Sequence, residues 1–376
     1  MQTFDRYLLR LFARVLLVCL ISITGLYIVV DSCNNLDEFL DYGKQRGFLW
    51  VLAEYYGARV PWFFDRISGL LALIAAMFAV TWLQRSNEMT ALLAAGIPKA
   101  RIIKPLIVAA AAVSLFAAAN REIIIPVNRP KLLRNAQDFL GDERRSLDPV
   151  RDYKTDILFT GEFTVAKEKR IERPSLRLHS RLGQFGSRIT AENAHERPPE
   201  EERPGGYLLD RVRQPVRVAE IPSVHLDGLP VILSPFDTPW LEADQCFVAS
   251  EINFNQLAGG TQWRQLASTG ELVAGLRNPS LDYGLGSRVT IHSRMVQPFL
   301  DMTLFFLGLP LVVSRESRNL FVAAGWCLLL VVAFFAVVLA CQSLGNFGYL
   351  VPALAAWLPV VLLAPCATAA ASPIWD

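Results

Sequence analysis

The chain has 376 residues, of which 52% are hydrophobic and 19% charged, and its mean hydropathy is +0.31. This composition excludes an ordinary soluble globular protein, in which about a quarter of the residues are charged. The net charge of +2 gives no indication of a nucleic-acid partner, and the six cysteines lie mostly in apolar runs without CxxC spacing, which indicates neither a disulfide framework nor a metal site.

The N-terminal segment predicts a membrane helix that enters from the cytoplasm. Arg6, Arg10 and Arg14 precede an uncharged run over 15–30, and acidic residues follow it. A cleaved signal peptide is the alternative, but no small-x-small site precedes a polar mature start. Because positive charge concentrates at the cytoplasmic ends of membrane helices, the arginines predict a cytoplasmic N-terminus.

Two more spans are predicted in the first third of the chain. Residues 35–60 are expected to form a short outside connection, and 61–84 form a second span that is uncharged after Arg66. The third span is predicted at 102–120. Each run is close to the roughly 20 residues that a helix needs to cross a bilayer.

A short amphipathic helix over 86–97 is predicted between the second and third spans. Ser86 is the expected N-cap, and Glu88 stands in the first turn, where a negative charge suits the helix dipole. Gly96 suits the left-handed position that ends a helix, and Pro98 prevents continuation. The basic residues around this segment predict that it lies on the cytoplasmic surface.

One apolar stripe runs along this helix. Met89, Leu92 and Leu93 occupy positions i, i+3 and i+4. The stripe is available to a partner protein in one interpretation. In the alternative it contacts only its own protein or lipid headgroups, because a stripe alone does not identify what covers it.

The segment 121–290 predicts a water-soluble domain outside the membrane. It is rich in Arg, Glu, Asp, Pro and Gly, and short stretches within it alternate with period two. Turn residues separate these stretches, which is typical of a β-sandwich or jelly roll. Residues 197–206 are the expected tip of a hairpin, and Ser268 to Arg277 a short helix with a capping box formed by Ser268 and Glu271.

The last part, 291–376, predicts three further spans. The fourth covers 295–314 and contains Asp301, and a basic inside loop with Arg315 and Arg318 follows. The run 319–375 has no charged residue and suits two helices joined by a turn at 343–349. The expected architecture is therefore a membrane α-helical fold of six spans, three within 1–120 and three within 291–376, with an inserted periplasmic all-β domain that resembles a jelly roll.

Signatures of catalysis are missing from the sequence. There is no GxxxxGK[ST], GxSxG, HExxH or SxxK segment, and the four histidines are scattered. The expectation is a protein that is not an enzyme, that holds no metal or other cofactor, and that acts in transport or as a scaffold.

Three regions of this sequence resemble the LptF/LptG (YjgP/YjgQ) permeases of lipopolysaccharide export. They are FDRYLLRLF at the N-terminus, EMTALLAAGIPKARI after the second span, and RMVQPFLDMTLFFLGLPLVVSRES with QSLGNFGYLVPALAAWLPVVL near the C-terminus. The resemblance covers nearly the whole chain. In the middle domain it is limited to length and β character.

The resemblance implies a permease subunit of an ABC-type exporter in the bacterial inner membrane. A cytoplasmic LptB-like ATPase dimer would use the ATP and bind the helix 86–97, while a second LptF/LptG-like permease, or a second copy of this chain, completes the membrane part. Lipopolysaccharide or a related glycolipid would then leave the membrane for periplasmic LptC/LptA-like bridge proteins. The residues implied in coupling are Glu88, Met89, Leu92, Leu93 and Gly96.

Lipid headgroup contact is expected from cations near the outer ends of the spans. The family tends to place basic groups after the first span, whereas this chain has acids there, so Lys44 and Arg46 are expected to replace them. Arg66 and Arg294 are further candidates, and the basic residues Arg59, Arg121 and Arg288 lie at similar positions. Asp301 is interpreted either as a structural polar contact or as a substrate contact.

Two other functions remain alternatives at this point. One is a non-transporting scaffold or sensor whose β domain binds a periplasmic ligand. The other is an ABC protein of the mechanotransmission type, although that class usually has four spans and six are predicted here.

Overall fold

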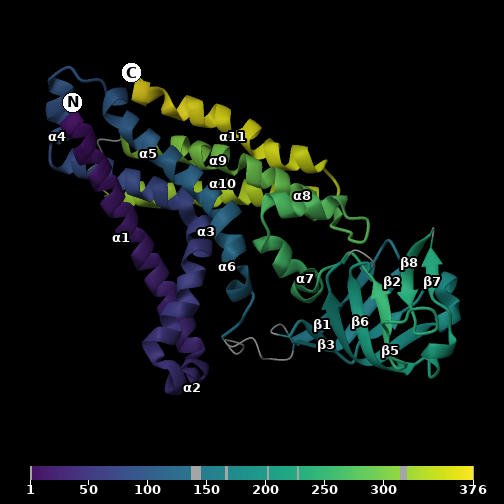
Figure 1. Ribbon diagram of the computed structural model, residues 1–376. Coiled ribbons are helices and arrows are strands. Elements are labelled where there is room, and N and C mark those ends of the chain that lie inside the picture. Colours follow the sequence, from purple (N-terminus) through teal and green to yellow (C-terminus); the bar gives the residue numbers. More distant parts are fainter. Residues whose placement is uncertain are drawn as a thin grey trace. The chain divides into compact units, whose positions relative to one another are not determined.

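The computed structural model describes residues 2–136, 145–165, 168–200, 203–226, 228–313 and 320–375. Its contacts divide the chain into two compact units. One unit is helical and comprises Met1–Asn128 with Gly284–Asp376, and the other, Arg129–Tyr283, contains the sheet (Figure 1).

The helical unit confirms the prediction of six helices that are long and apolar enough to cross a membrane. Its elements begin with α1 (Gln2–Asn34), α2 (Leu36–Arg46), α3 (Phe48–Arg85), α4 (Glu88–Ala94), α5 (Lys99–Ala119) and the π-helix η1 (Asn120–Ile124). After α6 (Ile125–Leu132), which runs into the second unit, and the inserted sheet come α9 (Gly284–Val313), α10 (Leu320–Asn346) and α11 (Pro352–Trp375). The predicted basic loop at Arg315 and Arg318 falls outside the described residues.

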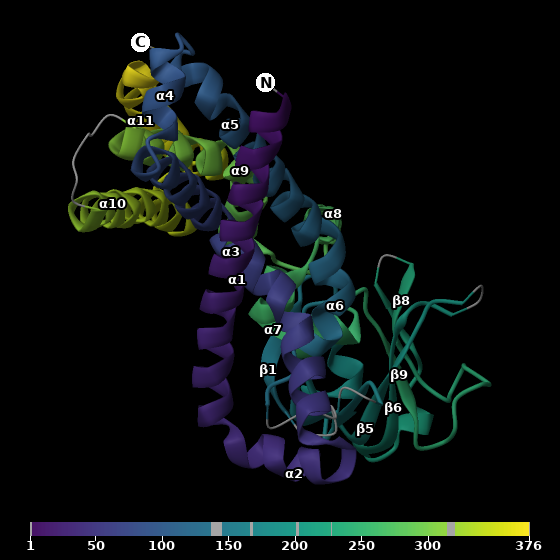
Figure 2. The same ribbon diagram turned by 90° about the vertical axis from the view of Figure 1, so that its left-hand side faces the viewer.

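The first two long helices extend well beyond the predicted spans. α1 is continuous over 33 residues, and the expected outside connection is itself helical, since it forms α2 and the first part of α3. Pro61 lies inside α3 and does not open it. The Asn120 side chain donates a hydrogen bond to the Pro61 carbonyl (2.8 Å), which joins the start of η1 to α3 at the proline. Figure 2 shows α2 at the end of the α1–α3 pair that lies far from α4.

α4 covers Glu88–Ala94 and is therefore shorter at both ends than the predicted helix over 86–97. Ser86 is not its N-cap, because the Ser86 hydroxyl donates to the Trp82 carbonyl (2.9 Å) at the end of α3. Asn87, with a positive φ of 54°, separates the two helices. Gly96 has the expected left-handed φ of 79°, and the Ile97 N–H reaches back to the Leu92 carbonyl (3.1 Å) as in a Schellman ending.

The third span also continues past its predicted end. At residue 120 the α-helix widens into one π turn, η1, and then returns to α-helical geometry in α6. Such a π turn changes the direction in which side chains leave the helix and is often found at functional sites.

α9 is the central helix of the helical unit, where it packs against α3, α5, α10 and α11. Two close approaches join α3 and α9. A Cβ on Gly69 would lie 2.6 Å from the Asp301 carboxylate, and one on Gly308 would lie 2.7 Å from the Leu73 side chain. Small residues at these crossings let the helices approach closely, as is common in membrane helix packing.

The second unit is built on one antiparallel sheet. Its strands are β1 (Arg145–Asp152), β2 (Ile157–Val165), β3 (Arg170–Glu172), β4 (Ser175–Arg177), β5 (Arg188–Arg197), β6 (Gly206–Gln214), β7 (Val224–Leu226), β8 (Leu229–Leu233) and β9 (Cys246–Ala249). They follow the order β1-β2-β3-β5-β6-β9-β8-β7, and β4 pairs with β2 and β5. The inserted β domain is thus confirmed, as a single hydrogen-bonded sheet whose edge strands are β1 and β7.

The core of this unit is formed by side chains of the sheet, with contributions from one α-helix and from two 3-10 helices, Ser180–Phe185 and Val218–Glu220. Buried side chains from most strands gather around Tyr207, and Phe254 and Leu257 of α7 (Phe254–Leu266) join the same cluster. The helix α8 (Thr269–Arg277) begins with the expected capping box of Ser268 and Glu271. The predicted hairpin at 197–206 joins β5 to β6, and residues 201 and 202 at its tip lie outside the described part.

Candidate functional site

The short helix α4 is held at one end of the helical unit by its own apolar residues. Met89 is buried, and Leu92 and Ile97 pack beside it against the core of the helix bundle. The apolar stripe is therefore not wholly available to a partner, because two of its three members fill a space inside this chain. The expectation that the stripe packs only on its own protein holds for Met89 and Leu92.

The remaining surface of α4, beside the buried Met89, is exposed and formed by small residues and one leucine. Leu93 is 38% exposed, and Thr90, Ala91 and Ala94 are exposed as well. Glu88 is half-buried at the first turn. Small side chains let another protein approach the helix closely, and Leu93 is the large apolar residue among the four.

The cluster beneath α4 connects it to most of the bundle. Its buried members come from α1, α3, α5, α9 and α11, and include Leu8, Leu83, Ile103, Leu309 and Ala371. A hydrogen bond from the Gln84 amide to the Val312 carbonyl (3.0 Å) joins the ends of α3 and α9 nearby. Of these helices, α3 packs most extensively against α4.

A tight ion pair lies toward the other end of the bundle. The Arg121 guanidinium on η1 contacts the Asp65 carboxylate on α3 at 2.8 Å and 3.0 Å, and the two side chains are only 14% and 10% exposed. A forked contact of this geometry is strong and orients both partners. The π turn of η1 gives Asn120 and Arg121 their direction toward α3.

Further charges surround this pair. Arg294 on α9 interacts electrostatically with Asp65, Arg66, Arg121 and Glu122. Arg66 is exposed, with its guanidinium 5.5 Å from the centre of the Trp62 ring. The structure thus brings Arg66 and Arg294, two of the predicted headgroup residues, to one place.

The other two predicted headgroup cations, Lys44 and Arg46, lie on α2 and not beside the Asp65–Arg121 pair. Lys44 and Arg46 are exposed at the end of α2, and Lys44 pairs with Asp41 at 2.7 Å. From Gly47, which precedes α3, to Arg66 the chain rises about 28 Å at 1.5 Å per residue. The acids that follow the first span have structural contacts, since Asp31 accepts a hydrogen bond from the Tyr56 hydroxyl (2.8 Å).

Asp301 sits where three helices meet. Its carboxylate accepts hydrogen bonds from Ser114 on α5 (2.8 Å) and Gln297 on α9 (2.9 Å), and it rests on Gly69 of α3. The side chain is 8% exposed. A buried carboxylate with donors on both oxygens is stabilised by its own protein, so this geometry favours the interpretation of Asp301 as a structural contact.

Sequence reasoning missed two members of this site, Asp65 and Asn120. Asn120 ends the third uncharged run, and Asp65 precedes Arg66 at the start of the second. Asp65 is also opposite in charge to Arg121, and these positions and charges were the available sequence signal. The pairing itself depends on the crossing of α3 and η1. Among the described residues, no group of three or more His, Cys, Asp or Glu side chains gathers as a metal site.

Comparison with known proteins gives one family. The family model described as "Lipopolysaccharide export system permease LptF/LptG" matches residues 6–202 and 250–371, which include α4, the Asp65–Arg121 pair and Asp301. A comparison with curated protein sequences gives no match. The match covers most of the chain, and the six apolar helices with an inserted β domain agree with it. The chain therefore belongs to the LptF/LptG family of lipopolysaccharide export system permeases.

Proposed function

We propose that this chain is a permease subunit of an ABC-type exporter that takes lipopolysaccharide or a related glycolipid out of the inner membrane. The energy comes from ATP used by a separate LptB-like ATPase dimer. A second LptF/LptG-like permease, or a second copy of this chain, forms the other half of the membrane part. The lipid passes to LptC/LptA-like periplasmic bridge proteins, which extend the β domain at an edge strand.

The observation that carries the proposal is the packing of α4. Its Met89 side is fixed in a cluster shared with five long helices, while its Leu93 side is exposed. A short helix anchored in this way can receive a force from a partner and pass it to the bundle. We assign the ATPase contact to the exposed face with Glu88, and the transmission to Met89, Leu92 and the turn at Gly96.

Charge distribution supports the orientation we propose. Arg6, Arg10 and Arg14 mark the α1 end near α4, and Arg85 and Lys99 flank α4 itself. Positive residues concentrate on cytoplasmic ends. We therefore place both termini and α4 in the cytoplasm and the sheet unit in the periplasm.

The anionic part of the lipid meets the cluster formed by Arg66, Arg121 and Arg294. Each cation near an anionic membrane surface contributes on the order of 1 kcal/mol. Arg121 is already neutralised by Asp65, so in this proposal Arg121 fixes the site and the exposed Arg66 makes the direct contact.

Substitution of Leu93 by Asp tests the coupling assignment. We expect the variant to fold normally, because Leu93 is exposed, and to lose the ATPase subunit during co-purification from membranes. Glu88→Lys is expected to weaken the same association, and Glu88→Gln to weaken it less. Val216→Asp, which puts an acid at an exposed apolar residue of the sheet unit, is the matched control and should leave association unchanged.

The contrast with Met89 gives the outcome that decides the assignment. Met89→Asp places a charge in the bundle core and should lower the yield of folded protein. If folded Leu93→Asp protein retains the ATPase and supports export at the wild-type rate, α4 is not the coupling element.

A further inference from the structure

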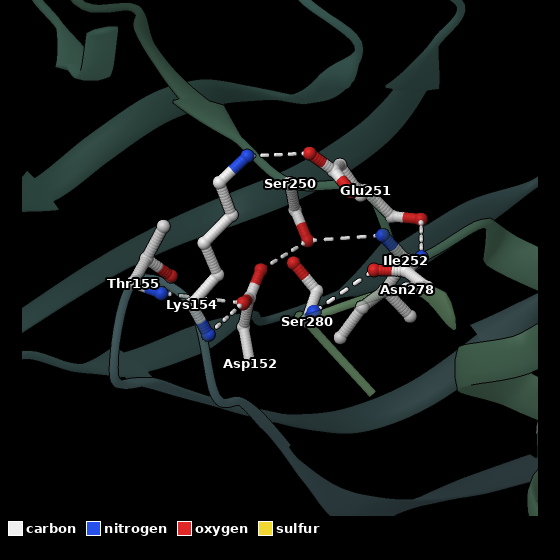
Figure 3. A network of polar contacts seen from close by, with 8 residues as sticks. All are labelled: Asp152, Lys154, Thr155, Ser250, Glu251, Ile252, Asn278 and Ser280. Atoms are coloured by element: carbon white, nitrogen blue, oxygen red, sulfur yellow. Dashed lines mark hydrogen bonds and ion pairs between the residues drawn. The ribbon is translucent and has the colours of Figure 1, made fainter. Parts of the chain in front are cut away.

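The charged side chains that stabilise each unit have partners in their own chain. In the sheet unit, the fully buried Asp152 accepts a hydrogen bond from the Lys154 N–H (3.0 Å), and the Lys154 ammonium pairs with Glu251 (Figure 3). In the helical unit, Asp5 of α1 pairs with Arg101 of α5 at 2.8 Å. Asp5 is the one acidic residue among the first 30 of the sequence, so the other cations of this segment need a counter-ion from elsewhere.

These other cations form an arginine stripe, Arg6, Arg10 and Arg14, at positions i, i+4 and i+8 on one face of α1. All three side chains are exposed, and none forms an ion pair or a hydrogen bond with the described residues of the chain. The opposite face of the helix carries Leu8 and Phe12, which are buried in the core of the helix bundle. The packing of α1 therefore turns the arginine stripe away from its own protein.

The arginine stripe starts at the polar end of the bundle and continues toward the membrane interior. The Asp5–Arg101 pair lies in the first turn of both α1 and α5, and Arg14 follows about 14 Å further along α1 at 1.5 Å per residue. A charge carried into a membrane without a counter-ion is costly. Helical side chains lean toward the N-terminus and long arginine side chains extend to the polar surface, so we expect the guanidinium groups of Arg10 and Arg14 near the level of Arg6.

Beyond Arg14 the same side of α1 is apolar and equally exposed. Leu17, Val18 and Ile21 are each more than half exposed. Tyr7, which is also exposed, lies beside Arg10 and offers a ring with a polar hydroxyl, as is common at membrane interfaces. This face thus carries cations toward its polar end and hydrocarbon surface further in, which is the complement of an anionic lipid with its acyl chains.

A second copy of this chain fits the face less well. The segment 319–375, which contains α10 and α11, has no acidic residue. Asp65 of α3 is paired with Arg121, and Asp301 of α9 is buried with donors on both oxygens. These helices offer apolar surface but no carboxylate for the arginine stripe. Lipid phosphates supply the missing charge, and their oxygens match the forked donors of arginine.

We propose that the arginine stripe, together with Leu17, Val18 and Ile21, binds one anionic phospholipid. Its phosphate oxygens accept hydrogen bonds from the guanidinium groups, and its acyl chains lie along the three apolar residues. Three cations at one level neutralise two phosphates better than one cation does, which favours cardiolipin over phosphatidylglycerol. The site depends neither on the coupling role of α4 nor on the direction of transport.

Lipid binding to the full chain, purified in a neutral detergent, tests the proposal. The probes are cardiolipin, phosphatidylglycerol and phosphatidylcholine, and native mass spectrometry measures the bound lipid. Cardiolipin should bind more tightly than phosphatidylcholine. Arg10→Gln and Arg14→Gln should each weaken cardiolipin binding about fivefold, the effect of one cation near an anionic surface, and the double variant about 25-fold.

Thermal unfolding gives a second measurement on the same variants. Since the arginines are exposed and have no partner among the described residues, the unfolding temperature without added lipid should equal that of the wild type. A ligand that binds only the folded state raises the unfolding temperature. Cardiolipin should therefore stabilise the wild type, and the double variant should lose most of this rise.

Controls separate the site from a general effect of charge. Arg85→Gln removes the same charge at an exposed residue of α3 and should leave cardiolipin binding unchanged. A photoreactive residue at position 17, in vesicles of phosphatidylcholine and cardiolipin, should label cardiolipin preferentially. One at position 332, an exposed apolar residue of α10, should label the two lipids in proportion to their content.

Three results would overturn the phospholipid site. One is that neither cardiolipin nor phosphatidylglycerol binds more tightly than phosphatidylcholine. Another is that Arg85→Gln weakens cardiolipin binding as much as Arg10→Gln does. The third is that position 17 labels a lipid A–type molecule more strongly than cardiolipin, which would assign this face to the exported lipid. Equal binding of phosphatidylglycerol and cardiolipin would support the site and assign one phosphate to it.

Discussion

Asp65 and Arg121 show how a single residue pair joins two elements of the helix bundle at the end far from α4. Neither is more than 14% exposed, and the forked contact joins α3 to η1. Removal of one partner leaves the other charge largely buried without compensation, and this is more costly than the loss of an exposed pair.

We predict that Arg121→Met lowers the free energy of unfolding by on the order of 3 kcal/mol, the loss typical of a broken buried pair. Thermal unfolding followed by tryptophan fluorescence in detergent measures it. The combined change Asp65→Asn with Arg121→Met should recover part of the loss. Lys44→Ala, which breaks a pair whose side chains are both 74% exposed, should stay within about 1 kcal/mol of wild type. If Arg121→Met and Lys44→Ala lowered the free energy of unfolding equally, burial of the Asp65–Arg121 pair would not explain its effect.

Asp301 gives a second prediction at the residue scale. Asp301→Asn keeps the size of the side chain and an acceptor for Ser114, so we expect folded protein with export near wild type. Asp301→Ala leaves Ser114 and Gln297 without their partner and should destabilise the protein by about 1–3 kcal/mol. A folded Asp301→Asn protein that no longer exports lipid would instead assign Asp301 a substrate role.

At the scale of elements, the contact between α3 and α9 depends on glycine. A Cβ at Gly69 would lie 2.6 Å from the Asp301 carboxylate, whereas a Cβ at Gly57, also on α3, would meet nothing within 4 Å. The same substitution on one helix therefore has opposite expected effects.

We predict that Gly69→Ala separates α3 from α9 and destabilises the bundle by about 1–3 kcal/mol, as overpacking does. Gly57→Ala should be neutral or stabilising by up to about 1 kcal/mol, because alanine is the better helix former. Unfolding temperatures of the two variants in one detergent provide the comparison. A loss at Gly57 as large as at Gly69 would show that helix propensity, and not the close approach, decides.

The start of α8 carries a pH-dependent contact. Burial raises the pKa of Glu271, but hydrogen bonds from Arg129 and from Ser268 outweigh it, so that the pKa lies below its ordinary value. Arg129 reaches both carboxylate oxygens (2.9 Å and 3.0 Å), and the Ser268 N–H donates to one of them (2.8 Å).

A group with a lowered folded pKa stabilises the protein above its unfolded pKa, about 4.3 for glutamate, and this contribution is lost as the pH falls through the folded value. We predict that the stability gap between wild type and Glu271→Gln closes on acidification below about pH 4. Because the Glu271 side chain is 37% exposed, the gap at pH 7 should not exceed about 1 kcal/mol. Glu220→Gln, in an exposed pair with Arg217, is the control and should show no such gap. A gap that widens in acid would contradict the assigned direction.

At the scale of the whole molecule, the proposed lipid contact depends on where the cations lie along the helices. Arg66 and Arg294 lie by the Asp65–Arg121 pair, while Lys44 and Arg46 stand at the end of α2. The predicted headgroup residues thus occupy two places on the helical unit.

We predict that a photoreactive residue at position 66 labels a lipid A–type molecule in membranes more strongly than one at 44 or 46. The paired change of Lys44 and Arg46 to Glu should then leave export nearly unchanged, whereas Arg66→Glu should reduce it. If positions 44 and 46 labelled the lipid A–type molecule more strongly than position 66, the headgroup contact would lie at the end of α2. Equal labelling of bulk phospholipid from all three positions would leave these arginines and Lys44 as interface anchors.

The sequence by itself determined the architecture of this protein. Uncharged runs of bilayer length and period-two alternation in 121–290 depend only on local composition and spacing, so six helices and an inserted β domain followed directly. The capping box of α8 and the glycine that ends α4 were also predictable, because each is formed by residues within one turn.

Only the tertiary structure decided which face of each element is covered. Met89 and Leu93 are both apolar members of one stripe, and the position of the bundle core buries the first and exposes the second. The contacts of Asp301 and the Asp65–Arg121 pair likewise join residues far apart in the chain. Such contacts arise from how helices cross and strands pair, and a pattern read along one segment carries no information about them.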